Sequence, residues 1–316
     1  MDDRASTLGR TACQIIANPM ITIRGCIGFS LLIYLSSALS AQIGTTTTNK
    51  IIDTIHSSIL KEDRFAWVHL PKNTDGKTPS KAAYPVVYVL DAEANFESTL
   101  EILNQLSKKT GSSVYSQTIV VGIGNIWERD RDYTPTHVNP SPFVEKMVAE
   151  KSGGGEKFTL FLEKELIPYI NSKYAPSSSR LLIGHSFGGL ITVNTLLNHT
   201  KLFSGYAAID PSMWWDDQRL LKQSKTILSE TEFKNISLFV AIANTKDKEM
   251  NDVSQIKKDV SEKTILIRPT VTFVDQLSAH KENALRFDWK YYKDQHHMSV
   301  YSSAVYDALE FLLKPL

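Results

Sequence analysis

The decapeptide LLIGHSFGGL, residues 181–190, contains the side chain with the clearest chemical potential. Ser186 stands in Gly-x-Ser-x-Gly spacing, where a buried-strand pattern changes into an apolar helical pattern. A sharp strand-to-helix turn exposes such a hydroxyl at a helix N-terminus, where backbone N–H groups favour developing negative charge. The five-residue pattern also occurs in glycine-rich turns without chemistry, but the strand–helix context favours a nucleophile. We predict that Ser186 attacks an electrophilic carbon.

A serine nucleophile needs a general base, and on this kind of turn the base comes last in the chain. His199 lies at the far end of the helix that begins beside Ser186, so it cannot fold back onto it. His280 falls near a helix end, whereas His296 and His297 follow the last predicted strand. We predict that this last loop supplies the base, with His297 favoured over His296.

The two remaining parts of such a site are a carboxylate and an oxyanion hole. The acid is expected after the strand predicted at 237–243, where spacing alone does not choose among several carboxylates. These are Asp247, Glu249, Asp252, Asp259 and Glu262. The oxyanion hole needs two backbone N–H groups. We expect one from Phe187 and the other from the loop after strand 85–90, at Ala92 or Glu93.

The elements that must position these residues alternate between buried strands and helices. Apolar, β-branched runs predict strands at 85–90, 118–123, 180–184, 205–209 and 237–243. A hairpin at 52–60 and 64–71 precedes them, and an alternating strand at 285–291 follows. Helical spacing occurs at 96–106, 158–170, 187–199, 267–280 and 302–313, with a long irregular stretch at 124–156. The chain is therefore α/β, with a mainly parallel central sheet covered by helices on both faces. Ligands of such sheets bind beyond the carboxyl ends of the strands.

The N-terminus has the order of a secretory signal peptide. Basic residues precede a short apolar run, Cys26–Leu35, and small residues follow up to Ala41. We predict a signal peptide at 1–41, in which the first 19 residues can be an extension upstream of a start at Met20. An uncleaved membrane anchor is the alternative, although the apolar run is too short to span a bilayer.

The predicted mature protein is a single domain at 42–316, secreted or periplasmic and without stable membrane insertion. Both cysteines, Cys13 and Cys26, lie upstream of the cleavage region, so the mature chain has no thiol chemistry. The net charge of +1, with no basic block, gives no indication of nucleic-acid binding.

Several segments resemble the putative-esterase branch of the α/β hydrolases, which includes siderophore esterases, feruloyl esterases and S-formylglutathione hydrolases. They are SSILKEDRFAWVHLPK, PVVYVLDAEANF, VVGIGN, RDYTPT, LLIGHSFGGL, AIDPSMWWD and HHMSV, and they span most of the chain from residue 51. Within this branch, the segments RDYTPT and PSMWW look most like those of the siderophore esterases.

The resemblance implies roles for further residues. The final His-x-Ser-Val places the family's catalytic histidine at His297, with Met298 where glycine is more usual. In this branch the acid varies, and some members work with a Ser–His pair. Similarity around IKKDVSEKT favours Asp259, with Glu249 as second choice. Substrate-lining residues would be Arg131, Tyr133, Trp214 and Trp215.

The resulting expectation is a secreted serine esterase with no metal and no organic cofactor. It would act on a small-molecule or polysaccharide-linked ester through an acyl-enzyme on Ser186. An acyltransferase of the same fold, or a catalytically silent ligand-binding relative, are the alternatives. The intact pair of Ser186 and His297 argues against the silent alternative.

Overall fold

A computed structural model describes residues 50–71, 84–125, 127–244 and 250–314. The predicted signal peptide at 1–41 lies outside these ranges, as does Glu249. Residues 47–316 form one compact unit.

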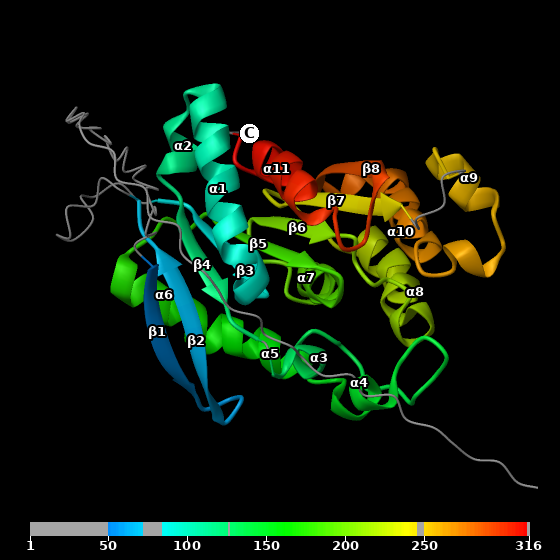
Figure 1. The fold of residues 1–316 in the computed structure, drawn as a ribbon, viewed down its shortest axis with the longest axis horizontal. Coiled ribbons are helices and arrows are strands. Elements are labelled where there is room, and N and C mark those ends of the chain that lie inside the picture. Colours follow the sequence, from blue (N-terminus) through cyan, green and yellow to red (C-terminus); the bar gives the residue numbers. More distant parts are fainter. Residues whose placement is uncertain (1–49, 72–83, 126, 245–249, 315–316) are drawn as a thin grey trace, which may run out of the picture. The chain divides into compact units, whose positions relative to one another are not determined.

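Eight strands of the described chain form one sheet in the order β1-β2-β4-β3-β5-β6-β7-β8 (Figure 1). β2 pairs antiparallel with β1 and β4, and all other neighbours are parallel. The strands are β1 (Lys50–Ser57), β2 (Glu62–His69), β3 (Val86–Leu90), β4 (Ile119–Ile123), β5 (Arg180–His185), β6 (Gly205–Ile209), β7 (Ser237–Asn244) and β8 (Arg286–His296). The expectation of a mainly parallel sheet is confirmed.

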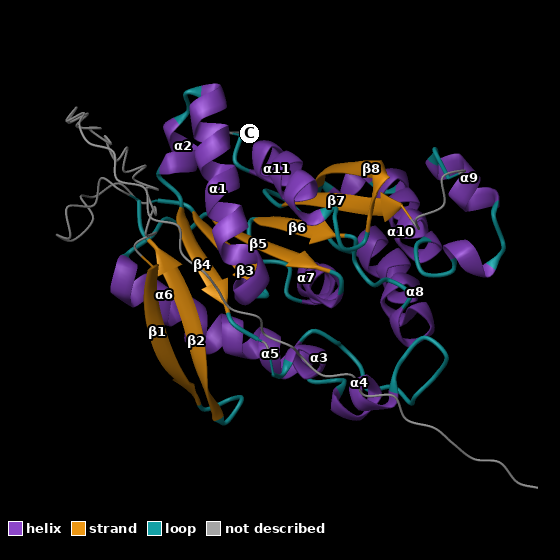
Figure 2. Ribbon diagram, in the orientation of Figure 1, coloured by secondary structure: helices purple, strands orange, loops and turns teal. Residues whose placement is uncertain are grey.

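Helices cover both faces of this sheet (Figure 2). On one face lie α1 (Ala92–Thr110), α2 (Ser113–Ser116) and α11 (Tyr301–Leu312). On the other lie α5 (Gly155–Phe161), η1 (Leu162–Leu166), α6 (Ile167–Tyr174), α7 (Phe187–Asn198), α8 (Trp215–Glu230), α9 (Val253–Lys258) and α10 (Arg268–Ala279). Short elements complete the chain: α3 (Arg129–Asp132), α4 (Lys146–Lys151), η2 (Glu262–Thr264) and η3 (Lys281–Asn283).

The continuous apolar runs form strands because both of their faces are buried. In β3, Val86, Tyr88 and Leu90 enter the core under α7, whereas Val87 and Val89 enter the core under α1. All five residues of this strand are fully buried. A strand covered on two faces has no polar alternation to show, so it reads as an unbroken apolar stretch.

Four features of the elements differ from the expectations. The segment 124–156 was expected to be irregular, but it contains α3 and α4. The helix expected at 158–170 is split, because one turn of wider π geometry at Leu162–Leu166 separates α5 from α6. The last strand runs on to His296 rather than ending near residue 291, and α8 was not anticipated.

Candidate active site

Ser186 occupies the single residue between β5 and α7. Its φ of 62° and ψ of −119° lie in a region that non-glycine residues adopt only under constraint from their surroundings. Two backbone hydrogen bonds supply that constraint: Ser186 N–H donates to Ile209 O at 3.0 Å, and Ser212 N–H donates to Ser186 O at 3.2 Å. The hydroxyl is thereby fixed at the carboxyl edge of the sheet.

The glycines around Ser186 differ in what they make possible. A Cβ on Gly184 would collide with the carbonyl group of Gly188, so this position must be glycine. A Cβ on Gly189 would lie 2.9 Å from Pro211 Cα, whereas one on Gly188 would meet nothing nearer than 3.6 Å. The start of α7 can therefore approach β5 and the chain after β6 because positions 184 and 189 are glycines. Gly188, the last glycine of the Gly-x-Ser-x-Gly pattern, is not needed for this approach.

Three side chains converge at this edge in a hydrogen-bonded row. Ser186 Oγ lies 3.0 Å from His297 Nε2, and His297 Nδ1 lies 2.6 Å from Asp210 Oδ2. The carboxylate accepts at Nδ1, so Nδ1 carries the ring proton and Nε2 is free to accept the serine proton. His296 is turned away, since its Nδ1 accepts the Met298 N–H at 3.3 Å.

The carboxylate in this row is Asp210, so the expectation for Asp259 is corrected. Asp259 is partly exposed and accepts hydrogen bonds from Thr264 and Ser261, which lower the pKa of its carboxyl group; its side chain makes these contacts and not one to His297. Asp210 directly follows β6, and its Oδ1 accepts the Ala243 N–H at 2.9 Å. Its position beyond a strand end was the available signal; the acid was instead sought one strand further along.

Two helices start beside Ser186 at the ends of adjacent parallel strands, β3 and β5. Phe187 is the first residue of α7, and Ala92 and Glu93 are the first two of α1. The N–H groups of a first helical turn have no acceptor within the helix, so they are available to an anion. The Glu93 side chain is engaged elsewhere, because its Oε1 accepts the Asn125 N–H at 3.1 Å.

An ion pair that the sequence did not reveal flanks this position. Arg129 Nε donates to Asp91 Oδ1 at 2.9 Å, and its Nη2 donates to His185 O at 3.3 Å. Burial raises the pKa of the Asp91 carboxyl, and Arg129 opposes that rise. The pair ties the start of α1 to the residue before Ser186. Asp91 follows a strand directly, which was a usable signal; Arg129 lies in a short helix that was not predicted.

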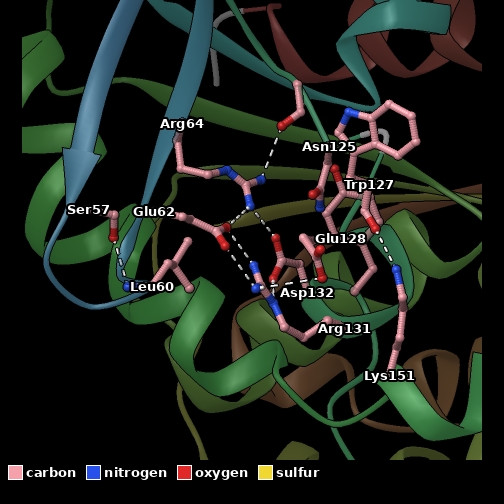
Figure 3. A network of polar contacts seen from close by, with 12 residues as sticks. Ser57, Leu60, Glu62, Arg64, Asn125, Trp127, Glu128, Arg131, Asp132 and Lys151 are labelled. Atoms are coloured by element: carbon pink, nitrogen blue, oxygen red, sulfur yellow. Dashed lines mark hydrogen bonds and ion pairs between the residues drawn. The ribbon is translucent and has the colours of Figure 1, made fainter.

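Arg131, for which a place in the substrate cleft was expected, has its guanidinium group bound by two carboxylates. It forms two hydrogen bonds with Glu62, of 2.7 and 3.0 Å, and a third with Asp132 at 2.7 Å (Figure 3). Arg64 joins the same network through Asp132 at 2.6 Å. These contacts fasten α3 to β2, and the Arg131 side chain lowers the pKa of Glu62.

The three aromatic candidates also differ in position. Tyr133 is fully buried, and its hydroxyl accepts the Asp91 N–H at 3.2 Å, so it supports the start of α1 from within. Trp215 is 2% exposed and donates to Thr136 O at 3.2 Å. Trp214 is only partly buried, and its ring lies 6.1 Å from that of Phe187, next to the nucleophile position. Of the aromatic candidates, Trp214 keeps an accessible face close to Ser186.

Two further properties concern the described residues only. They contain no group of three or more His, Cys, Asp or Glu side chains arranged to hold a metal ion. They also contain no helix with the length and apolar character needed to cross a membrane.

This fold and site define the α/β hydrolases: a serine on a strained strand–helix turn, followed in the chain by an aspartate and a histidine that meet it at the carboxyl edge of the sheet. Within that class the chain belongs to the family described as "Putative esterase", which matches residues 57–308. It is thus a member of an ester-hydrolase family, and the resemblance to siderophore esterases is confirmed.

Individual relatives agree with this assignment. The chain is 28% identical over 246 residues to the ferri-bacillibactin esterase BesA of Bacillus subtilis, which covers 75% of this chain and 81% of that protein. An IroE-like serine hydrolase from Shewanella oneidensis has a TM-score of 0.71 at 33% identity, covering 82% and 78% of the two chains. The siderophore hydrolase EstA of Aspergillus nidulans, at 20% identity, shares the fold with a TM-score of 0.68 over 84% and 95%.

Proposed function

We propose that the protein is a serine esterase that cleaves an ester bond of a siderophore through an acyl-enzyme on Ser186. The observation that carries this proposal is the row Ser186–His297–Asp210, with contacts of 3.0 and 2.6 Å. Nucleophile, base and orienting acid each have the partner that their role requires.

The reaction proceeds in two half-steps. Ser186 Oγ attacks the ester carbonyl carbon while its proton passes to His297 Nε2, and the carbonyl oxygen becomes an oxyanion. The N–H of Phe187 and those at Ala92 and Glu93 stabilise that charge. The intermediate collapses, the C–O bond to the alcohol breaks, and His297 returns the proton to the departing oxygen. In the second half-step, His297 takes a proton from water as the water oxygen attacks the acyl carbon; the bond from that carbon to Ser186 Oγ then breaks, and His297 returns the proton to Oγ.

Asp210 keeps the imidazole in its reactive tautomer and stabilises the imidazolium formed in each half-step. It is held in turn by the Ala243 N–H, so the carboxylate has a fixed orientation before substrate binds. Groups that are oriented in advance lower the barrier because they need no reorganisation during the reaction.

The substrate class is supported by the similarity to BesA, which is a ferri-bacillibactin esterase. Trp214, partly exposed beside Phe187, offers an apolar surface to the acyl group next to Ser186. The predicted signal peptide would place the reaction outside the cytoplasm.

The test uses the purified mature protein with a fluorophosphonate probe, p-nitrophenyl acetate, and a panel of siderophore esters and feruloyl esters ranked by kcat/KM. We expect probe labelling, and the highest kcat/KM with the siderophore esters. Ser186→Ala and His297→Ala should abolish hydrolysis, whereas the exposed Ser141→Ala and the neighbouring His296→Ala should retain it.

No labelling and no hydrolysis by the wild-type protein would refute the esterase mechanism. A kcat/KM that is higher for feruloyl esters would leave the mechanism intact and refute the substrate class.

A further inference from the structure

His185 links the nucleophile to the loop that carries the base, although 112 residues separate it from His297. Its Nε2 lies 2.9 Å from the backbone carbonyl oxygen of His297. A carbonyl oxygen only accepts, so His185 Nε2 carries a proton and donates it. The residue before Ser186 thus holds the main chain of the residue whose ring must reach Ser186.

The two imidazole rings also pack against each other. Their centroids lie 4.5 Å apart at an interplanar angle of 35°. Tyr301, at the start of α11, also packs against His185, with the two ring centroids 6.1 Å apart, and its hydroxyl lies 3.2 Å from the Thr99 hydroxyl. The His185 ring is therefore in contact with both the base and a buried tyrosine.

The surroundings of His185 favour its neutral form, chiefly through burial. Burial lowers the pKa of His185 to about 4, and the neighbouring His297 adds to this; Arg129 also lowers it, whereas Asp210 opposes the shift. With Nε2 protonated and the ring neutral, His185 is a hydrogen-bond donor that adds no positive charge beside His297. This matters because His297 becomes an imidazolium in each half-step, and a second cation at 4.5 Å would oppose that charge.

The loop is also held by its neighbours in the chain and by the pairing of His296 with Asn244 of β7. Asp210 and Ser186 bind only the ring nitrogens of His297, and the backbone turn after it is closed by Ser299 N–H and Val300 N–H donating to His296 O at 2.8 and 3.1 Å. Met298, directly after the base, is 76% exposed and packs little. The hydrogen bond from His185 adds a direct link between the main chain of His297 and the end of β5.

We propose that His185 is a positioning residue for His297: its Nε2–H holds the His297 carbonyl, and with it the base, in line with Ser186. This inference rests on the proposed function, in which His297 is the base. In this view His185 helps to align the proton transfer from Ser186 to His297, and it does more than separate Gly184 from Ser186.

Two matched variants test the inference. The amide nitrogen of glutamine lies about as far from the backbone as the Nε2 of histidine does, so it can donate to the His297 carbonyl. Asparagine is one methylene shorter and cannot donate to that carbonyl. We expect His185→Asn to lower kcat for p-nitrophenyl acetate by about 10-fold with KM changed less than about twofold, since one hydrogen bond and the alignment it provides are lost. His185→Gln should stay within about threefold of wild type.

A second measurement does not depend on activity. Hydrogen exchange of the Ser299 and Val300 amides reports how firmly the loop is held. We expect exchange about 10-fold faster in His185→Asn and close to wild type in His185→Gln.

Equal losses in both variants, or unchanged exchange in both, would overturn the inference, because the ring would then act by packing alone or not at all. A wild-type protein without esterase activity would refute the proposed function instead, and the exchange data would still decide whether His185 holds the loop.

Discussion

At the scale of single residues, the site depends on which carboxylate meets the imidazole. Asp210 has a positive φ of 42°, and its backbone N–H donates to Ala241 O at 2.9 Å, so it is held at the end of β6 by the neighbouring β7. Its side chain then reaches both Ala243 and His297. Such a carboxylate is oriented by the sheet, whereas Asp259 is oriented only by its own loop.

Asp210→Asn should therefore lower kcat strongly. The amide can donate to His297 Nδ1 and so favours the wrong imidazole tautomer, for which a loss of about 10²–10⁴-fold is expected. The measurement is kcat for p-nitrophenyl acetate at pH 7.5. Asp259→Asn serves as the control and should stay within about twofold of wild type; a large loss in Asp259→Asn with a small one in Asp210→Asn would contradict the assignment.

At the scale of elements, the β5–α7 joint sets the position of Ser186 and Asp210 together. α7 passes close to the chain after β6, where the site of a Gly189 Cβ lies 2.9 Å from Pro211 Cα and 3.1 Å from Ile209 O. Pro211 follows Asp210 directly, so any displacement there also moves the acid. The close packing of one helix start thus controls two members of the site.

Gly189→Ala should destabilise the protein and impair catalysis together. The added methyl group must push backbone atoms aside, which costs about 1–3 kcal/mol of unfolding free energy and shifts Asp210. Urea unfolding and kcat are the measurements. Gly188→Ala is the matched control, since its Cβ has room, and it should unfold and react like wild type; equal effects of the two substitutions would show that this close approach does not govern the site.

The elements were largely predictable from the sequence. The strands at 86–90, 119–123 and 205–209 bury both faces, so their apolar runs are unambiguous. The short helices α3 and α4 were missed because four to six residues carry too little periodicity to be recognised. α8 was missed because it contains few apolar residues, so its sequence shows no clear helical spacing. Its first turns also include three residues with positive φ, Asp216–Gln218.

At the scale of the whole molecule, the sheet separates two apolar cores, and the site lies at the sheet edge between them. His185 is partly buried there, and its pKa is lowered from 6.5 to about 4. Between these two pH values the unfolded chain binds a proton at His185 that the folded protein does not bind. The corresponding stability is complete above about pH 6.5 and is lost as the pH falls towards 4.

The free energy of unfolding should therefore fall more steeply on acidification in the wild-type protein than in His185→Gln. A pKa shift of this size corresponds to about 3 kcal/mol between pH 7 and pH 4 as an upper value. Urea unfolding at several pH values gives both curves, and their difference removes the contribution of all other groups. Parallel curves would mean that His185 is not held neutral by the fold.

The sequence by itself determined the α/β class, the strand–helix turn at Ser186 and the loop that carries His297, because these depend on local periodicity and on chain order. Only the tertiary structure decided that Asp210 is the carboxylate that contacts His297, that Arg131 is bound within the network around Glu62, and that His185 donates to the His297 carbonyl. The reason is physical: carboxylates, guanidinium groups and imidazoles take their roles from partners 69 to 112 residues away in the chain. Those partners are brought together only when the strands assemble into one sheet and the helices pack onto it.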